Sequence, residues 1–236
     1  MLKSSFSWCR ARKRMPDDAW FVIERSAAIQ SKPAALHFLD QPIVLVRAAD
    51  GAIIALEDRC PHQGVPLSHG RLGPKGLMCR FHGWSFDGRG RCTSMPGMDS
   101  ELVDEIRVRS YQIQERDGLI WISRSATAPM PACMADMDGR NSPYFLWETK
   151  WRESAAVLQS RLGRKYYSDG SVVQIGARAA LGCTVRTTLC ITPETSISCR
   201  VFAIAQIETR WLPHWVAHMI TMPARNRLGD AQALLA

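Results

Sequence analysis

The chain has 236 residues, a net charge of +8, 46% hydrophobic residues and 22% charged residues. This composition is typical of a folded globular protein and excludes a disordered chain. No apolar run approaches the roughly 18 to 20 residues that a membrane-spanning helix needs. The 30 basic residues are scattered and are not interleaved with aromatic residues on one segment, which argues against nucleic-acid binding. Solubility, or docking to an acidic protein partner, explains the charge better.

The first residues, MLKSSFSWCRARKRM, are basic and lack the continuous apolar core of a secretory signal. A transit peptide is one interpretation, but we favour a mobile basic tail because the folded pattern begins almost at once, with Asp17 and Trp20. The eight cysteines are spread along the chain, so we expect no disulfide framework. We expect instead a reducing compartment, the cytoplasm, where paired Cys and His residues more often bind metal.

Strand signals are dense from about Trp20 to Ser123. An Asp-Gly pair at 50–51 separates two apolar runs, 42–46 and 53–56, and predicts a β-hairpin because glycine accepts the positive φ of a tight turn. We therefore predict a small antiparallel β domain. Its other expected elements are a strand at 84–86, a turn at 87–90, a half-buried strand at 106–109, a turn at 117–118 and a strand at 119–122.

The pattern changes at residue 126. Prolines, small residues and the lack of periodicity predict a linker over 126–142, in which Met130, Met134 and Met137 are packing residues and not a metal or haem site. The C-terminal region has weaker signals. Its expected elements are a short helix at 155–166, a hairpin of strands 183–191 and 196–206 joined by a turn at 192–195, and a helix over 212–222 that starts at Pro213.

Two short segments carry Cys/His pairs: Cys60-Pro61-His62 and Cys79-Arg80-Phe81-His82. Thiolates and neutral imidazoles bind both zinc and iron–sulfur clusters, so two sites are open. One is a structural zinc with two Cys and two His. The other is a [2Fe–2S] centre in which one iron takes both Cys and the other takes both His. Mixed pairs in two similar loops favour the binuclear cluster, because zinc sites usually pair Cys with Cys.

These pairs, the run Pro66-Leu67-Ser68-His69-Gly70 between them and Trp84 after them resemble the Rieske domain of Rieske non-haem iron oxygenases. The similarity is to the vanillate O-demethylase-like oxygenase components and covers roughly residues 18 to 124. The residues that also match this pattern are Asp58, Gly88 and Pro96.

Two departures from the pattern are mild. Gln63 replaces a common Arg and Phe81 a common Tyr, and both could alter hydrogen bonding around a cluster. The respiratory-complex type carries an extra Cys in each loop, where this chain has Gly64, Val65 and Phe81. The resemblance therefore indicates the oxygenase or ferredoxin type. His69 and His37 are expected to be surface or structural histidines.

The resemblance implies a mainly β fold. We expect an antiparallel Rieske β-sandwich over 17–125, the linker at 126–142, and a truncated α+β, helix-grip-like remnant of an oxygenase catalytic domain over 143–236. Cys60 and Cys79 would hold the inner iron, and His62 and His82 the outer iron, with imidazole edges facing solvent. A flavin/iron–sulfur reductase would donate electrons, the substrate would be a small organic molecule, and family members are often homotrimers.

The same resemblance implies a mononuclear Fe(II) bound by two His and one carboxylate. The family pattern, Asp-x-x-His followed by His five residues later, is not found after Tyr144. His214 and His218 are spaced i, i+4 and Asp230 could be the carboxylate, but these residues come too late in the chain. We favour a catalytic domain with an internal stretch missing, so that Arg152 leads almost directly to the segment near Gly170.

Two functions compete on this basis. The first is an oxidoreductase: the oxygenase component of a Rieske-type monooxygenase or dioxygenase, which relays electrons for O2-dependent hydroxylation or demethylation of an organic, aromatic substrate. The second is a Rieske ferredoxin-like electron-transfer protein without its own mononuclear iron. The missing triad favours the second, and the oxygenase-like flanks of the Rieske motif favour the first. The catalytic residues are unknown.

Overall fold

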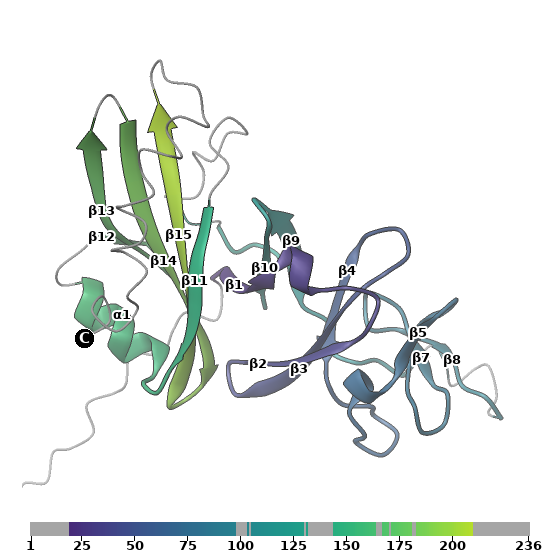
Figure 1. Ribbon diagram of the computed structural model, residues 1–236. Helices are drawn as coiled ribbons and strands as arrows, with labels where there is room; N and C mark the ends of the chain where they lie inside the picture. The colour runs from purple at the N-terminus through teal and green to yellow at the C-terminus, as the bar shows by residue number, and fades with distance from the viewer. Residues whose placement is uncertain are drawn as a thin grey trace, which may run out of the picture.

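The computed structural model of the protein describes residues 19–97, 103, 105–129, 131, 144–163, 167–169, 171–180 and 183–209. The N-terminal region contains three small antiparallel sheets, and the C-terminal region contains a single long antiparallel sheet with a helix beside it (Figure 1). The expected mainly β fold is therefore confirmed. No helix among these residues is long and apolar enough to cross a bilayer.

Six strands form the first two sheets: β1 (Phe21–Arg25), β2 (Ala34–Phe38), β3 (Gln41–Arg47), β4 (Ile53–Glu57), β9 (Gln112–Arg116) and β10 (Leu119–Ser123). Their orders are β1-β10-β9 and β2-β3-β4. The predicted hairpin is confirmed, because Arg47 pairs with Ile53 and Gly51 in the turn has a φ of 88°. The 3-10 turn η1 (Ser26–Ala28) follows β1.

The third sheet, β5-β6-β7-β8, carries the segments around the Cys/His pairs. Its elements are β5 (Arg71–Gly73), β6 (Gly76–Met78), β7 (Ser85–Phe86) and β8 (Cys92–Ser94), preceded by the 3-10 turn η2 (Leu67–His69). β7 confirms the predicted strand at 84–86. The strand predicted at 106–109 is wrong: only an isolated bridge, Arg91 with Arg107, occurs there. The backbone of this segment bonds in turn to Cys92, Gly90 and Glu57, so no continuous ladder forms.

The long C-terminal sheet has the order β11-β15-β14-β13-β12. The expected helix at 155–166 is confirmed as α1 over Ala155–Gly163, the part of it that the structure describes, and it packs against the sheet through Leu158 and Leu162. The elements of this region are β11 (Tyr144–Trp151), α1 (Ala155–Gly163), β12 (Tyr167–Asp169), β13 (Val172–Ala180), β14 (Cys183–Thr195) and β15 (Ser198–Thr209).

The predicted hairpin of β14 and β15 is confirmed, but its turn lies at 196–197 and not at 192–195. Tertiary contacts keep the intervening residues extended. Thr192 Oγ1 donates to the carbonyl of Val22 at 2.5 Å, and the carbonyl of Pro193 accepts from the N–H of Leu39 at 3.1 Å. The strand thus continues past a proline that alone favours a turn.

One hydrophobic core joins the two regions. Phe21 and Phe38 from the N-terminal sheets pack with Leu158 of α1 and with Leu189 and Val201 of the long sheet, and none of these side chains is more than 1% exposed. The expected domains, 17–125 and 143–236, therefore share a core, and the positions of their boundaries stay a prediction. A second core lies between β3, β4 and the third sheet, directly beneath the Cys/His segments.

Several sequence-based expectations lie outside the described residues. They concern the basic N-terminal tail, most of the 126–142 linker with its three methionines, and the helix at 212–222. His214, His218 and Asp230, the weak candidates for a second iron site, also lie there. Of the linker, the carbonyl of Ala128 accepts a hydrogen bond from the indole of Trp20 at 2.8 Å.

Candidate metal centre

The first Cys/His segment follows β4 and forms a loop that closes on its own backbone, called loop A below (residues 60–65). The N–H of Cys60 donates to the carbonyl of Val65 at 2.8 Å, and the N–H of Gly64 returns a bond to the carbonyl of Cys60 at 2.8 Å. Gly64 has a φ of 72°, a left-handed conformation that glycine adopts without strain. This double closure fixes the direction of the Cys60 side chain.

Loop B (residues 79–84) connects β6 to β7 and repeats this geometry. The N–H of Cys79 donates to the carbonyl of Trp84 at 2.8 Å, and the N–H of Gly83 donates to the carbonyl of Cys79 at 3.2 Å. Gly83 also has a φ of 72°. Although one segment reads C-x-H and the other C-x-x-H, the two loops are equivalent in backbone closure, with Val65 at the position of Trp84.

A buried carboxylate closes the base of loop A, and a close backbone approach holds the turn after loop A against the strand that leads into loop B. Asp58, 7% exposed, accepts hydrogen bonds from the N–H and the hydroxyl of Ser68, both at 2.6 Å. Gly70, at the end of η2, lies against the strand that leads into loop B: a Cβ there would be 2.0 Å from the carbonyl oxygen of Met78. Sequence reasoning gave Ser68 and Gly70 no such role, since neither contact is local in the chain.

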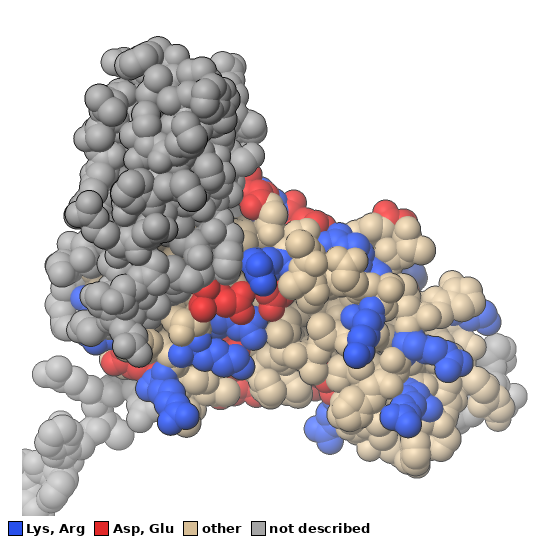
Figure 2. All heavy atoms as spheres, in the orientation of Figure 1, with Lys and Arg blue, Asp and Glu red and all other residues tan. Residues whose placement is uncertain are grey.

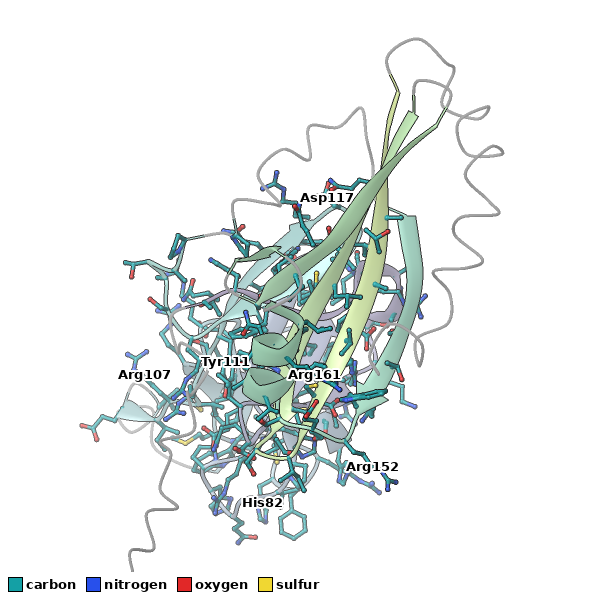
Figure 3. The ribbon with its side chains drawn as sticks, turned by 90° about the vertical axis from the view of Figure 1, so that its left-hand side faces the viewer. His82, Arg107, Tyr111, Asp117, Arg152 and Arg161 are labelled. Carbon is teal, nitrogen blue, oxygen red and sulfur yellow. The ribbon has the colours of Figure 1, made fainter. Side chains whose placement is uncertain are left out.

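The four candidate ligands divide into an inner and an outer pair. Cys60 and Cys79 are only 2% and 3% exposed, within the second hydrophobic core. His62 and His82 are exposed, and their ring centroids lie 4.6 Å apart. Figure 3 places His82 at one end of the molecule. The structure thus places the two cysteines beside each other in the core and the two histidine rings beside each other at the surface.

Burial, with a smaller contribution from the neighbouring Cys79, raises the pKa of Cys60 to about 11, while backbone N–H groups of the loop oppose the shift. The buried Cys60 thiol therefore resists ionisation without a compensating cation. A metal supplies that cation and binds the thiolates directly. This pair of sulfur atoms is therefore suited to a metal that remains in place.

The donor set and its division fit a [2Fe–2S] cluster, which asks for only two protein ligands on each iron. Two buried sulfurs and two outer imidazoles match its requirement.

The aromatic surroundings of the two imidazoles differ. Trp84 stacks on His62, with centroids 4.6 Å apart and planes 8° apart, whereas Phe81 meets His82 edge-on at 4.5 Å. Trp84 is buried, and Phe81 is 61% exposed. His69 lies on the surface, as expected, and borders a shallow depression with Arg80 and Cys79. The Trp84 contact was not predicted, although the tryptophan stands two residues after the second histidine.

Two closed loops on an antiparallel β framework, with a buried Cys pair beneath an exposed His pair, define a Rieske-type iron–sulfur domain. Residues 19–112 match the family model described as "Rieske [2Fe-2S] domain". The chain therefore contains a Rieske [2Fe–2S] domain.

Several relatives of the chain are monooxygenases or oxygenase components. It is 36% identical over 140 residues to 4beta-methylsterol monooxygenase of Methylococcus capsulatus, a match that covers 56% of this chain and 38% of the relative. It is 41% identical over 105 residues to the oxygenase component of dicamba O-demethylase of Stenotrophomonas maltophilia, covering 44% and 31%. The vanillate O-demethylase oxygenase subunit of a Pseudomonas species is 36% identical over 107 residues, covering 45% and 30%. The chain thus matches about a third of the length of these relatives.

Similarity of fold extends further than similarity of sequence. Apo dicamba monooxygenase superposes with a TM-score of 0.72 at 21% identity, covering 93% of this chain and 84% of that one. NdmA of Pseudomonas putida CBB5 gives a TM-score of 0.68 at 17% identity, covering 93% and 81%. The shared fold therefore includes the long C-terminal sheet.

Proposed function

We propose that the chain is the oxygenase component of a Rieske-type monooxygenase or dioxygenase. In this proposal Cys60 and Cys79 bind the inner iron of the cluster, and His62 and His82 bind the outer iron. The cluster relays electrons for the O2-dependent hydroxylation or demethylation of a small, aromatic substrate. The observation that carries the proposal is the pair of equivalent loops, in a domain that several oxygenase components share.

When bound, the cluster supplies one-electron transfer at a higher potential than that of clusters held by four cysteines. The protein's role is to bind the cluster, to shield its sulfur side from water and to leave its histidine side exposed. Leu67, Leu77 and Phe86, all fully buried, surround the two cysteines and keep water from the sulfur side. The exposed edges of His62 and His82 then offer the short path by which electrons enter and leave.

The electron donor in this proposal is a flavin/iron–sulfur reductase with an acidic docking surface. Figure 2 shows separate basic groups over the visible face of the region built from β2 to β8, while acidic groups gather nearer the middle of the view. Arg59 and Arg80 belong to the exposed residues beside the loops. Such a distribution favours an acidic partner and speeds its encounter at low ionic strength.

We place this activity in the cytoplasm, and homotrimeric assembly is the arrangement that the resemblance suggests. Cys60, Cys79, Cys92 and Cys199 are buried thiols that form no disulfide with one another, which suits a reducing compartment. An oxygenase also needs the mononuclear iron. The residues that would bind it are not assigned, since His214, His218 and Asp230 lie outside the described residues.

Anaerobic purification of the full chain, followed by iron, zinc and acid-labile sulfide analysis and EPR of the dithionite-reduced protein, tests the proposal. We expect two irons and two sulfides per chain and a Rieske spectrum. Zinc without sulfide would overturn it. A third iron, lost in the His214→Ala or His218→Ala variant, would support an autonomous oxygenase. Cluster iron alone, without oxygenation of any aromatic substrate when a reductase is supplied, would favour the electron-transfer alternative.

A further inference from the structure

One aromatic contact crosses from loop B to loop A. The indole of Trp84 lies face to face on the imidazole of His62, with centroids 4.6 Å apart and an angle of 8° between the planes. Trp84 is only 5% exposed and belongs to the second hydrophobic core, so its ring is held from behind. A rigid, buried plane thus supports an exposed imidazole of the other loop.

Little else among the described residues fixes the position of His62. The backbone hydrogen bonds of each loop close that loop on itself, and within the described part of the chain none of them joins 60–65 to 79–84. The side chain of His62 contacts the His82 ring at 60° and 4.6 Å, which is not a stacked arrangement. The flat contact with Trp84 is therefore the one that sets the plane of the imidazole.

Only one of the two equivalent loops receives such support: His62 of loop A has a buried aromatic plane against it, and His82 of loop B has none. The position of Trp84 in loop A is occupied by Val65, a small branched side chain that offers no plane to His82. His82 instead meets Phe81, its neighbour in sequence, edge-on at 65°. His62 is thus held against the core by Trp84, whereas His82 lies against the exposed ring of Phe81.

We propose that Trp84 is a positioning residue for electron transfer: its indole holds His62 in the ring orientation in which it binds the outer iron, and it sets the reduction potential of the cluster. This inference rests on the proposed function, because it assumes that His62 is a ligand. It adds a residue that is not itself a ligand, and it assigns unequal roles to the two imidazoles.

The direction in which loss of the indole shifts the reduction potential follows from the charge of the cluster. With two thiolates, two sulfides and two neutral imidazoles, the cluster is neutral when both irons are ferric and gains one negative charge on reduction. The electron-rich face of the indole favours the more positive, oxidised state of the ring beneath it. Water admitted in place of the indole would favour the charged, reduced state. Removal of the indole therefore raises the potential by both routes.

The test uses the full chain loaded with its cluster. Trp84→Leu and Trp84→Met remove the indole, and Trp84→Phe restores an aromatic ring. The control is Phe81→Leu, which removes an aromatic ring beside the other imidazole. Iron and sulfide content establish that each variant holds the cluster. Redox titration at one fixed pH and EPR with nitrogen hyperfine spectroscopy then report the potential and the orientation of the ligand rings. Trp84→Leu and Trp84→Met both remove the aromatic plane, so either variant can be used if the other does not fold.

We expect Trp84→Leu and Trp84→Met to raise the ratio of reduced to oxidised cluster at a fixed solution potential about three- to ten-fold. One of the two histidine nitrogen couplings should change with it. Trp84→Phe should shift the ratio less, and Phe81→Leu less than two-fold. Non-aromatic variants with wild-type potential and couplings would overturn the inference and leave the proposed function intact. A wild-type protein without sulfide would overturn the proposed function itself.

Discussion

Arg200 of β15 donates from Nη1 to the carboxylate of Glu24 in β1 at 2.9 Å, which joins the last strand of the C-terminal sheet to the first strand of the Rieske domain. Arg200 is 8% exposed, and its Nε also reaches Glu194 at 3.2 Å. Its guanidinium lies 5.8 Å from the centroid of the Phe202 ring. One buried cation thus serves two carboxylates at the junction between the two regions.

Replacement of this cation should destabilise the whole protein. Arg200→Met would leave Glu24 largely buried without its ion-pair partner, while Glu194 would keep only Lys150, whose Nζ lies 3.3 Å from Oε1. Loss of one partner of a buried ion pair costs up to about 3–5 kcal/mol of unfolding free energy. Urea unfolding measures the change. The control is Arg91→Met, which breaks the ion pair with Asp87 at 2.8 Å where Arg91 is 56% exposed; such pairs contribute at most about 1 kcal/mol. Equal losses in both variants would contradict the assigned role of Arg200.

Asp58 should matter for retention of the cluster more than for global stability. Asp58→Ala removes the acceptor of both Ser68 hydrogen bonds, an expected cost of about 1–3 kcal/mol that falls on the entry to loop A. We expect iron to be lost to a chelator several-fold faster than from the wild type, as followed by the visible absorption of the cluster.

A turn at some distance from the cysteines provides the control for Asp58. Asp87→Ala also removes a carboxylate that accepts two backbone bonds, from Arg89 and Arg91 at 2.9 Å each. It should lower the unfolding midpoint without a matching rise in the rate of iron loss. If both variants release iron at the same rate, Asp58 has no specific role in holding loop A.

Features that depend on neighbours in sequence could be predicted, and those that depend on tertiary contacts could not. The Asp50-Gly51 turn and the short Cys/His segments are local, so their chemistry could be seen in the chain itself. The predicted turn of the β14–β15 hairpin is misplaced because hydrogen bonds to the carbonyl of Val22 and from the N–H of Leu39, both far away in sequence, keep residues 192–195 extended.

The distinction between features set by neighbours in sequence and features set by tertiary contacts also holds within the candidate site. The sequence predicts four ligands, and the structure brings these residues together, although their binding of iron stays a prediction. The contact of Trp84 with His62 joins two loops and has no periodic or spacing signature. The pairing of β11 with β15 joins residues more than forty positions apart and could not be derived from local patterns either.

Gly70 should be required for its small size and not for its conformation. Its φ of −83° suits any residue, but a Cβ would meet the carbonyl oxygen of Met78 at 2.0 Å and that of Leu67 at 2.9 Å. Gly70→Ala should therefore push the end of β6 away from η2, at a cost of about 1–3 kcal/mol or more. Because β6 leads directly into Cys79, we also expect the purified variant to contain less iron and sulfide.

Gly118→Ala is the conformational counterpart of this variant. Gly118 has a φ of 73°, and no atom lies within 4 Å of the point that a Cβ would occupy, so alanine there meets only backbone strain of about 1–2 kcal/mol. Thermal unfolding should reveal a loss in both variants, but only Gly70→Ala should alter the iron content. A Gly70→Ala protein with full iron would show that the approach of η2 to β6 is not needed for the site.

Alkaline pH should weaken the fold through Cys199, a fully buried thiol of β15. Burial raises its pKa to about 12, and the charges of Glu153 and Glu194 act in the same direction. Since an unfolded cysteine ionises near pH 9, the folded state holds this proton more tightly. The stability that the neutral thiol contributes is complete below pH 9 and is lost as the pH rises from 9 towards 12, by up to about 1.4 kcal/mol per pH unit.

Urea unfolding of the reduced protein between pH 8 and 11 measures this dependence. Other groups also titrate in that range, so the informative quantity is the difference between the wild type and Cys199→Ala. The variant should be less stable at pH 8, because it loses the packing of the sulfur atom. Its stability should fall less steeply above pH 9, so that the two curves converge. Parallel curves across the range would mean that Cys199 is not the group whose ionisation opposes folding.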